Sequence, residues 1–201
     1  MNHTERDIVI IGCPRSGKTT LTNRIMQDNN IYNSISLDSL TIAIKRTMPE
    51  VGIDDKSNVI QISKKIVPFL AKYLQCYKRD FPEKRYIVEG IQINPEDLIV
   101  EKFFNNAQVI CLGYVNTTID DIYNKIRLED SKLEVAYTKR MTEEELKKRI
   151  AFSLSYSKFL QDKCEKYGIP FYQTNENREE TLEYILKTEI HGKNLCDNLQ
   201  R

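Results

Sequence analysis

Apolar residues along the chain follow two alternating patterns, short segments typical of strands and longer stretches with helical spacing. The short segments lie at residues 8–11, 34–37, 86–88, 109–115 and 169–172. Such segments are typical of strands in a parallel sheet that is buried on both faces. Between them, apolar side chains recur every three or four positions, as in residues 59–74 and 119–128. Strands that alternate with helices predict an α/β fold, with a five-stranded parallel sheet and helices on both of its faces.

Several polar residues mark where these helices begin and end. Asn94 is suited to cap a helix that starts with proline, and Thr142 with Glu145 matches the capping box that begins a long helix. Gly168 is expected to end that long helix. Pro68 lies inside the helical stretch at 56–77 and predicts a kink there.

Composition narrows the classes of protein that remain. The chain has 201 residues, of which 40% are hydrophobic, and 30 basic against 29 acidic residues leave a net charge of +1. We expect a single domain over residues 1–201. The near-neutral net charge gives no reason to expect nucleic-acid binding, and no apolar stretch is long enough to span a membrane. The N-terminus has no signal-like segment, and the five cysteines form no C-x-x-C pair. These features predict a soluble cytoplasmic protein without a disulfide framework or a zinc site.

The first predicted strand runs into a phosphate-binding pattern, G-x-x-x-x-G-K-[ST], known as the P-loop or Walker A motif. Its residues, with the one that follows, are Gly12, Cys13, Pro14, Arg15, Ser16, Gly17, Lys18, Thr19 and Thr20. Glycines allow a tight loop whose backbone N–H groups turn toward a phosphate. Lys18 is expected to reach the β- and γ-phosphates of ATP, and the Thr19 hydroxyl is expected to ligate Mg²⁺. Because a strand precedes the motif and a helix follows it, the sequence predicts that residues 12–20 bind Mg-ATP.

The same loop is also similar to the P-R-S-G-T-T signature of sulfotransferases, whose loop binds the 5′-phosphate of a sulfonated adenosine donor. In this chain Lys18 stands between Gly17 and Thr19. Since a γ-phosphate requires the extra cation, Lys18 favours a nucleoside triphosphate. Sulfotransfer is left as a lesser alternative.

Two acidic residues, Asp38 and Glu89, follow neighbouring predicted strands. Ligands of parallel sheets collect at the carboxyl ends of the strands, so we expect both carboxylates in the cleft beside the P-loop. Asp38 is a candidate catalytic residue that orients or deprotonates the acceptor hydroxyl, and its alternative role is a helix N-cap. Glu89 is expected to hold Mg²⁺ through water, and its alternative is a solvated acid at a strand end.

Basic residues before the long capped helix predict a small helical lid at about residues 127–141. Arg127 and Arg140 are candidate catalytic residues there, because a planar guanidinium matches the oxygens of a transferring phosphoryl group. Arg46, a few residues past Asp38, is a candidate for binding an anionic acceptor. For each of these arginines the alternative is a solvated surface charge.

With this layout the chain resembles the P-loop kinases of the adenylate kinase-like group, which includes nucleotide, shikimate and small-metabolite kinases. The resemblance implies the strand order 2-3-1-4-5, an arginine-bearing lid, and an adenine site flanked by residues 173–178. Residues 88–95 are also similar to the E-G-v-h-x-x-P stretch of 2-phosphoglycerate kinase-like proteins, with Gln92 where that family tends to have His. An acidic acceptor is implied, and the candidate substrate-binding residues are Asp38, Arg46, Glu89 and Gln92.

Three functions stay open on the sequence alone. The favoured one is an ATP-dependent kinase that moves the γ-phosphate to a hydroxyl or phosphate of a nucleoside, nucleotide or acidic metabolite. The second is an NTPase switch, of which a GTPase is disfavoured because the chain has no N-K-x-D motif. The third is a nucleotide-binding regulatory protein that has lost transfer chemistry. The acceptor and the oligomeric state are not determined by the sequence.

Overall fold

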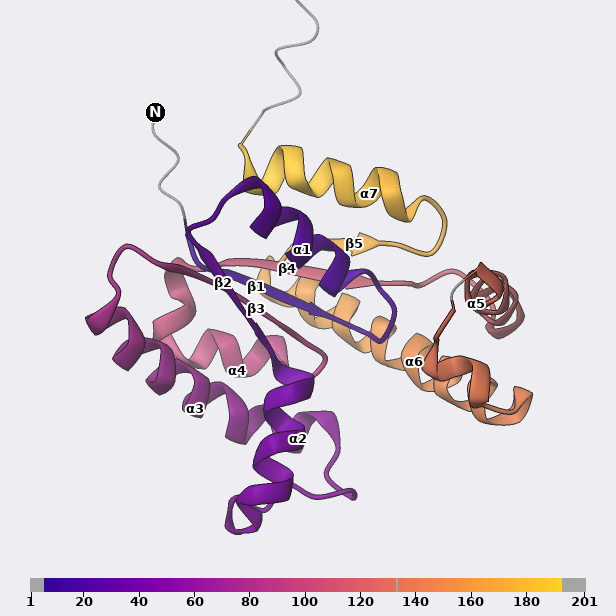
Figure 1. Cartoon of the computed structure of the whole chain (residues 1–201), viewed down its shortest axis with the longest axis horizontal. Helices are drawn as coiled ribbons and strands as arrows, with labels where there is room; N and C mark the ends of the chain where they lie inside the picture. Colours follow the sequence, from indigo (N-terminus) through magenta and orange to yellow (C-terminus); the bar gives the residue numbers. More distant parts are fainter. Residues whose placement is uncertain (1–5, 133, 193–201) are drawn as a thin grey trace, which may run out of the picture.

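The computed structural model describes residues 6–132 and 134–192 and has a three-layer α/β fold (Figure 1). Five parallel strands form one sheet in the order β2-β3-β1-β4-β5. The strands are β1 (Ile8–Gly12), β2 (Tyr32–Ser36), β3 (Arg85–Gly90), β4 (Gln108–Gly113) and β5 (Phe171–Gln173). The predicted fold class and the predicted strand order are both confirmed.

Helices cover both faces of the sheet, as Figure 1 shows. One face carries α1 (Lys18–Asp28) and α7 (Arg178–Ile185), and the other carries α3 (Val59–Asp80), α4 (Pro95–Val100) and α6 (Glu143–Tyr167). The central strand β1 is fully buried. Its alternate residues belong to different cores, with Ile8 and Ile10 in the first and Val9 and Ile11 in the second. A strand that must be apolar on both faces explains the unbroken hydrophobic run at residues 8–11.

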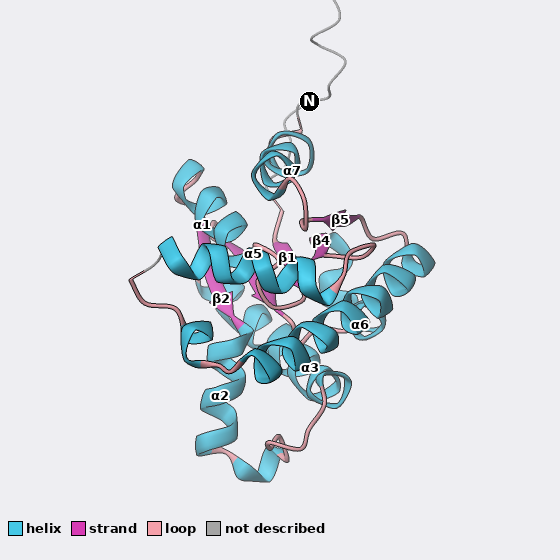
Figure 2. Ribbon diagram, turned by 90° about the vertical axis from the view of Figure 1, so that its right-hand side faces the viewer, coloured by secondary structure: helices cyan, strands magenta, loops and turns pink. Residues whose placement is uncertain are grey.

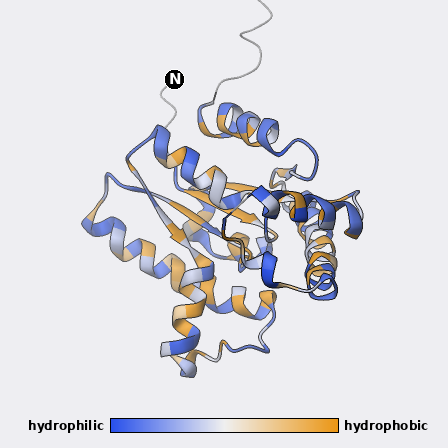
Figure 3. Ribbon diagram, turned by 45° about the vertical axis from the view of Figure 1, so that its right-hand side comes forward, coloured by the Kyte–Doolittle hydropathy of each residue, from blue (hydrophilic) through white to orange (hydrophobic). Residues whose placement is uncertain are grey.

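Two more helices lie beyond the carboxyl ends of the strands. Helix α2 (Leu37–Thr47) continues directly from β2, and α5 (Ile119–Lys132) lies across the ends of the strands, as Figures 1 and 2 show together. Short 3₁₀ helices occur at Pro49–Val51, Lys102–Asn106 and Tyr137–Arg140, and a π-helical turn at Leu186–Ile190. The strands are mainly hydrophobic, whereas hydrophobic and hydrophilic residues alternate along the helices (Figure 3).

Helix ends follow the local signals in the sequence closely. Thr142 and Glu145 form the expected capping box at the start of α6, and Gly168 ends that helix with a φ of 66°. Asn94 caps α4. Helix α3 continues through Pro68. No helix in residues 6–132 and 134–192 has the length and apolar character needed to cross a bilayer.

Of the predicted boundaries that differ from the structure, the end of the second strand is the one that changes the position of Asp38. The strand was expected to extend through Leu37, but β2 ends at Ser36 and Leu37 already belongs to α2. Leu37 is completely buried and lies against Gly90, where an added Cβ would come within 2.7 Å of the Leu37 Cβ. An apolar residue at this position suits a strand and a buried first helical turn equally well. Asp38 therefore lies in the first turn of α2, after the residue that caps the helix.

Candidate active site

The P-loop, residues 12–19, turns at the carboxyl edge of the sheet between β1 and α1. A Cβ at Gly12 would lie 2.2 Å from the Leu112 carbonyl oxygen, so no larger residue fits without displacing β4. Gly17 has a φ of 96°, in the left-handed region that favours glycine. Arg15 also has a positive φ, of 62°, which costs a non-glycine residue about 1–2 kcal/mol. The loop thus holds one strained residue between two required glycines.

Polar groups of the loop are arranged for an anionic ligand. Lys18 is buried, and its Nζ donates a hydrogen bond to the Cys13 carbonyl oxygen at 2.9 Å. Ser16 is completely buried, and its Oγ has no hydrogen-bond partner among the residues that the structure describes. A buried polar atom without a partner is costly, and functional sites are one place where such atoms persist. The donors of the loop and its orphaned hydroxyl therefore fit the phosphates of a nucleotide.

Cys13 serves the loop as a packing residue. Its side chain is completely buried, and this burial raises the pKa of the thiol, an effect that nearby Ser157, Tyr114 and Lys18 only partly oppose. The thiol is therefore neutral, and it packs in the hydrophobic core on which the loop rests. The Tyr114 hydroxyl donates a hydrogen bond to the Pro14 carbonyl oxygen and steadies the loop from the β4 side.

Glu89 lies beside the P-loop at the end of β3. It pairs in register with Ser36 of β2 and with Ile10 of β1. Burial raises the pKa of its carboxyl, and the nearby charge of Asp38 raises it further. Lys18 and hydrogen bonding with the hydroxyls of Ser36 and Thr19 act in the opposite direction. The structure therefore brings together four of the predicted residues, namely Lys18, Thr19, Asp38 and Glu89.

Gln92 holds the Asp38 carboxylate in place. Its Nε2 donates a hydrogen bond to Asp38 Oδ1 at 2.5 Å, and because a carboxylate only accepts, this bond fixes the orientation of the amide. The Gln92 Oε1 is left buried without a partner among the described residues. It lies so close to Gly90 that a Cβ there would come within 2.6 Å of it. The carboxylate itself is exposed in the first turn of α2, where the partial positive charge of a helix N-terminus stabilises an anion.

Arg15 joins the P-loop to the segment before α6. Its Nη2 donates to Asp130 Oδ1 at 2.9 Å, and its Nη1 donates to Thr138 Oγ1 at 2.9 Å. The Thr138 hydroxyl in turn donates to Asp130 Oδ2 at 2.7 Å. Asp130 and Thr138 are only 3% and 1% exposed. This buried network anchors the strained loop residue against the expected lid.

The other predicted arginines lie in three different environments. Arg127 donates to the Thr138 and Met141 carbonyl oxygens at 3.0 and 2.9 Å, so its guanidinium holds the segment before α6. Arg140 is exposed and lines a pocket beside α6. Arg46 is exposed in the last turn of α2, two turns from Asp38, and does not line the pocket that contains Asp38. Catalytic or substrate-binding roles for these arginines stay predictions.

Two pockets flank the P-loop. One, of about 370 Å³, lies between the loop, Asp38 and α6, and its lining includes Tyr114, Tyr137 and Arg149. The other, of about 350 Å³, is formed by residues 174–180 after β5 together with two residues of α5. Its Arg178 lies over the P-loop, since a Cβ at Gly17 would be 3.6 Å from the Arg178 Cδ. No three His, Cys, Asp or Glu side chains in the described part of the chain are grouped as metal ligands.

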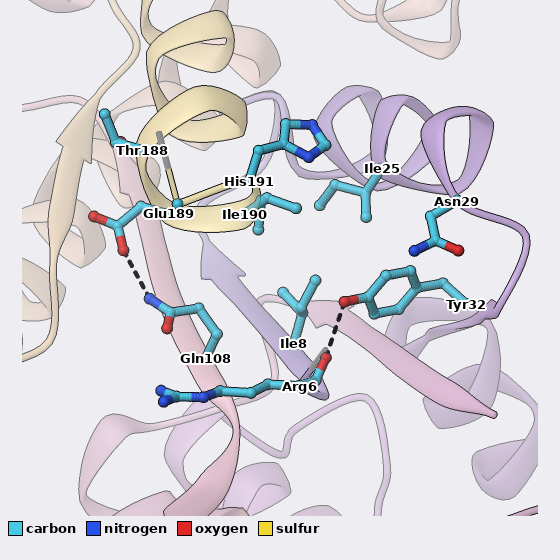
Figure 4. Close-up of a pocket in the computed structure, with 11 residues that line it drawn as sticks. Arg6, Ile8, Ile25, Asn29, Tyr32, Gln108, Thr188, Glu189, Ile190 and His191 are labelled. Atoms are coloured by element: carbon cyan, nitrogen blue, oxygen red, sulfur yellow. Dashed lines mark hydrogen bonds between the residues drawn. The ribbon is translucent and has the colours of Figure 1, made fainter. Parts of the chain in front are cut away.

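A further pocket, of about 430 Å³, lies at the opposite end of the sheet (Figure 4). The first residues of three strands line it, namely Ile8, Tyr32 and Gln108. Gln108 donates to Glu189 at 2.7 Å, and the Tyr32 hydroxyl donates to the Arg6 carbonyl oxygen at 3.1 Å (Figure 4). None of the predicted site residues lines this pocket, so the candidate active site is at the P-loop end.

Sequence reasoning missed Asp130, Thr138 and the pocket lining on α6. The only signal for Asp130 was an acidic residue in a helix that is otherwise apolar on its inner face, and nothing local links it to Arg15. Tyr137 lies in the 3₁₀ helix Tyr137–Arg140 and Phe152 in α6, and no motif in the sequence marks either ring.

Comparison with solved structures shows that the chain has the same fold as two small-molecule kinases, as predicted. A gluconokinase from Sinorhizobium meliloti matches with a TM-score of 0.57 at 14% sequence identity, over 96% of this chain and 95% of its own. A shikimate kinase from Bacteroides thetaiotaomicron matches with a TM-score of 0.54 at 14% identity, over 92% of this chain and 98% of its own. At this identity the similarity establishes the fold alone. No protein-family model and no curated protein sequence matches the chain.

The Arg15 network predicts a strong coupling energy. Arg15→Ala should lower the free energy of unfolding by about 3–5 kcal/mol, because the carboxylate of Asp130 is left buried without its cation. The double variant Arg15→Ala/Asp130→Ala should lose less than the sum of the two single variants, as measured by urea denaturation. Arg24→Ala, which removes an exposed ion pair with Glu179, serves as a control and should cost less than about 1 kcal/mol. Additive losses for the Arg15 pair would contradict the network.

Glu89 predicts a dependence of stability on pH. Its pKa is raised above the ordinary value of 4.5, so just above that pH the folded chain holds a proton that the unfolded chain has lost. Stability therefore falls as pH rises through this window. Glu89→Gln should raise the melting temperature at pH 7 by about 2–4 °C, and the difference should close below pH 4.5. Thermal unfolding across pH 4–8 tests this, with the exposed Glu144→Gln as a control; an equal shift for both variants contradicts it.

Proposed function

We propose that this protein is an ATP-dependent kinase that transfers the γ-phosphate to a hydroxyl of a small molecule. The observation that carries the proposal is the convergence of Lys18, Thr19, Asp38 and Glu89 at the carboxyl edge of the sheet. In a parallel α/β sheet this edge is where ligands bind. The names of two proteins of the same fold, a gluconokinase and a shikimate kinase, support the same class of reaction.

The P-loop would bind the phosphates through its backbone N–H groups and through Lys18. For this, the Lys18 ammonium exchanges its hydrogen bond to the Cys13 carbonyl for the phosphate oxygens. Thr19 would hold Mg²⁺ directly and Glu89 through water, since magnesium keeps several waters and takes few protein ligands. The bound ion would neutralise charge on the phosphates during transfer.

The pocket after β5 would take the adenine. It adjoins the P-loop through Arg178, whose Nη1 pairs with Glu129 at 3.1 Å and whose Nε is buried without a hydrogen-bond partner among the described residues. The resemblance implies the same position, because it flanks the adenine with residues 173–178. The ATP would then extend from this pocket over Gly17 and toward Asp38.

Asp38 would accept the proton of the acceptor hydroxyl as that oxygen attacks the γ-phosphorus and the bond to the leaving ADP oxygen breaks. Its carboxylate is exposed at the pocket of about 370 Å³, where an acceptor has room beside the loop. Gln92 restricts that carboxylate to one orientation, which supports in-line geometry. The pocket beside Asp38 distinguishes this kinase from a simple NTPase, because an NTPase needs room only for water.

Lys18→Ala should lower magnesium-dependent transfer from ATP by about 100- to 1000-fold, because it removes the cation that stabilises charge on the transferred group. The measurement is radiolabelled γ-phosphate transfer, screened over nucleosides, nucleoside monophosphates, sugars and hydroxy acids. Lys158→Ala on the exposed face of α6 is the control. Unchanged turnover in Lys18→Ala would refute the assignment of the P-loop.

Asp38→Asn should leave ATP binding intact and lower transfer by about 100- to 10,000-fold, because the amide cannot accept the proton. ATP binding is measured by calorimetry, and transfer by the same radiolabel assay. Asp162→Asn, on the solvent side of α6, is the matched control. Full transfer in Asp38→Asn would show that Asp38 is not the base and only contributes to the N-terminus of α2.

A further inference from the structure

Exposed aromatic rings border the pocket beside Asp38. Tyr137 and Phe152 line it and are 58% and 50% exposed. The rest of the lining includes the aliphatic side chains of Ile126, Leu146 and Ile150. Exposed large apolar groups that gather around a cavity mark a binding surface more often than chance exposure does. The walls of this pocket are therefore suited to a flat, apolar group.

Two small polar side chains in the wall, Thr138 and Ser153, are already engaged within the protein. The Thr138 hydroxyl donates to Asp130 and accepts from Arg15. Ser153 is hydrogen-bonded to Tyr114. A ligand rich in hydroxyl groups would leave several of them without partners here, and each unmet hydrogen bond costs about 1–3 kcal/mol.

Three cationic side chains lie beside the aromatic rings of this pocket. Arg149 lines the Asp38 pocket and also an adjoining pocket of about 580 Å³, which shares Tyr137 and Phe152 and contains Arg140 and Lys148. None of these three cations has a hydrogen bond or an ion pair with another described residue, although Arg149 interacts electrostatically with Glu145, one turn earlier on α6. The nearby Glu145 is bound to the N–H and hydroxyl of Thr142 in the capping box of α6. A net positive charge therefore faces this end of the pocket.

We propose that the acceptor is a small anion built on a flat, apolar ring, with its ring between Tyr137 and Phe152, its anionic group at Arg149, and its hydroxyl at Asp38. This inference rests on the proposed kinase function and specifies its acceptor class. The carboxylate or phosphate of the acceptor meets the cations, while the ring meets the apolar walls. The carboxylate of a polyhydroxylated sugar acid would pair with the cations, but its hydroxyl groups would not find hydrogen-bond partners on the apolar walls.

Binding of a flat anionic probe tests the proposal directly. The probe is 1-anilinonaphthalene-8-sulfonate, titrated by fluorescence into the full chain with Mg²⁺ and a saturating non-hydrolysable ATP analogue. Arg149→Gln should weaken probe binding about tenfold, because it removes a charge-assisted contact. Phe152→Ala should weaken it about fivefold, because it removes a ring contact.

Two matched variants control for general effects. Lys166→Gln changes another cation of α6, and Phe69→Ala removes a similarly exposed ring on α3. Both should bind the probe as the wild type does, and thermal unfolding checks that all four variants are folded. Absent probe binding, or equal binding by the wild type and both pocket variants, overturns the proposal. Equal weakening by the controls overturns it as well.

Displacement of the probe tests the ring separately from the charge. At equal concentrations 4-(hydroxymethyl)benzoate should displace the probe, whereas gluconate, which carries the same charge, should not. Equal displacement, or displacement by gluconate alone, overturns the requirement for a ring.

The same experiment separates this proposal from the kinase assignment. If Mg-nucleotide binding depends on Lys18 but the pocket variants bind the probe normally, only the acceptor class is refuted. If the wild type binds no Mg-nucleotide, the kinase assignment itself fails, whatever the probe does.

Discussion

The approach of Gly12 to the Leu112 carbonyl oxygen is the constraint on which the rest of the site depends. It allows β1 to pair with β4 through its last residue and then turn at once into the P-loop. The register of β1 with β3 sets Ile10 opposite Glu89, and the register of β3 with β2 sets Glu89 opposite Ser36. One buried central strand thereby aligns the phosphate loop, a buried carboxylate and the start of α2. The packing and register of the strands, more than any single polar contact, therefore position the residues of the site.

Arg15 links local strain to tertiary structure. Its left-handed backbone is unfavourable by itself, yet its side chain reaches two buried groups in other elements, Asp130 and Thr138. A change in the conformation of the loop would alter the same hydrogen bonds that hold the segment before α6. Arg127 fixes this segment from the other side through two backbone carbonyls. The phosphate loop and one wall of the Asp38 pocket therefore share a single network.

The sequence predicted what depends on local pattern. The P-loop, the caps at Asn94 and Thr142 and the helix end at Gly168 all follow from spacing or from a motif, whereas the strand order follows from the resemblance to the adenylate kinase-like group. It did not predict pairs that are distant along the chain, because no local pattern marks them. Arg15 and Asp130 are 115 residues apart, and Asp38 and Gln92 are 54 apart. The end of β2 was misplaced because Leu37 is apolar in either conformation, and only its burial against Gly90 decides between them.

Both ends of the described chain lie at the amino edge of the sheet. Arg6 and Gly192 line the same pocket, on the side away from the P-loop. A fluorophore, affinity handle or surface tether attached beside Arg6 or Gly192 would therefore leave the P-loop edge of the sheet facing the solution. Immobilised in this way, every molecule would present the same face to a flowing ligand, so sensor-based affinity measurements would sample one uniform population.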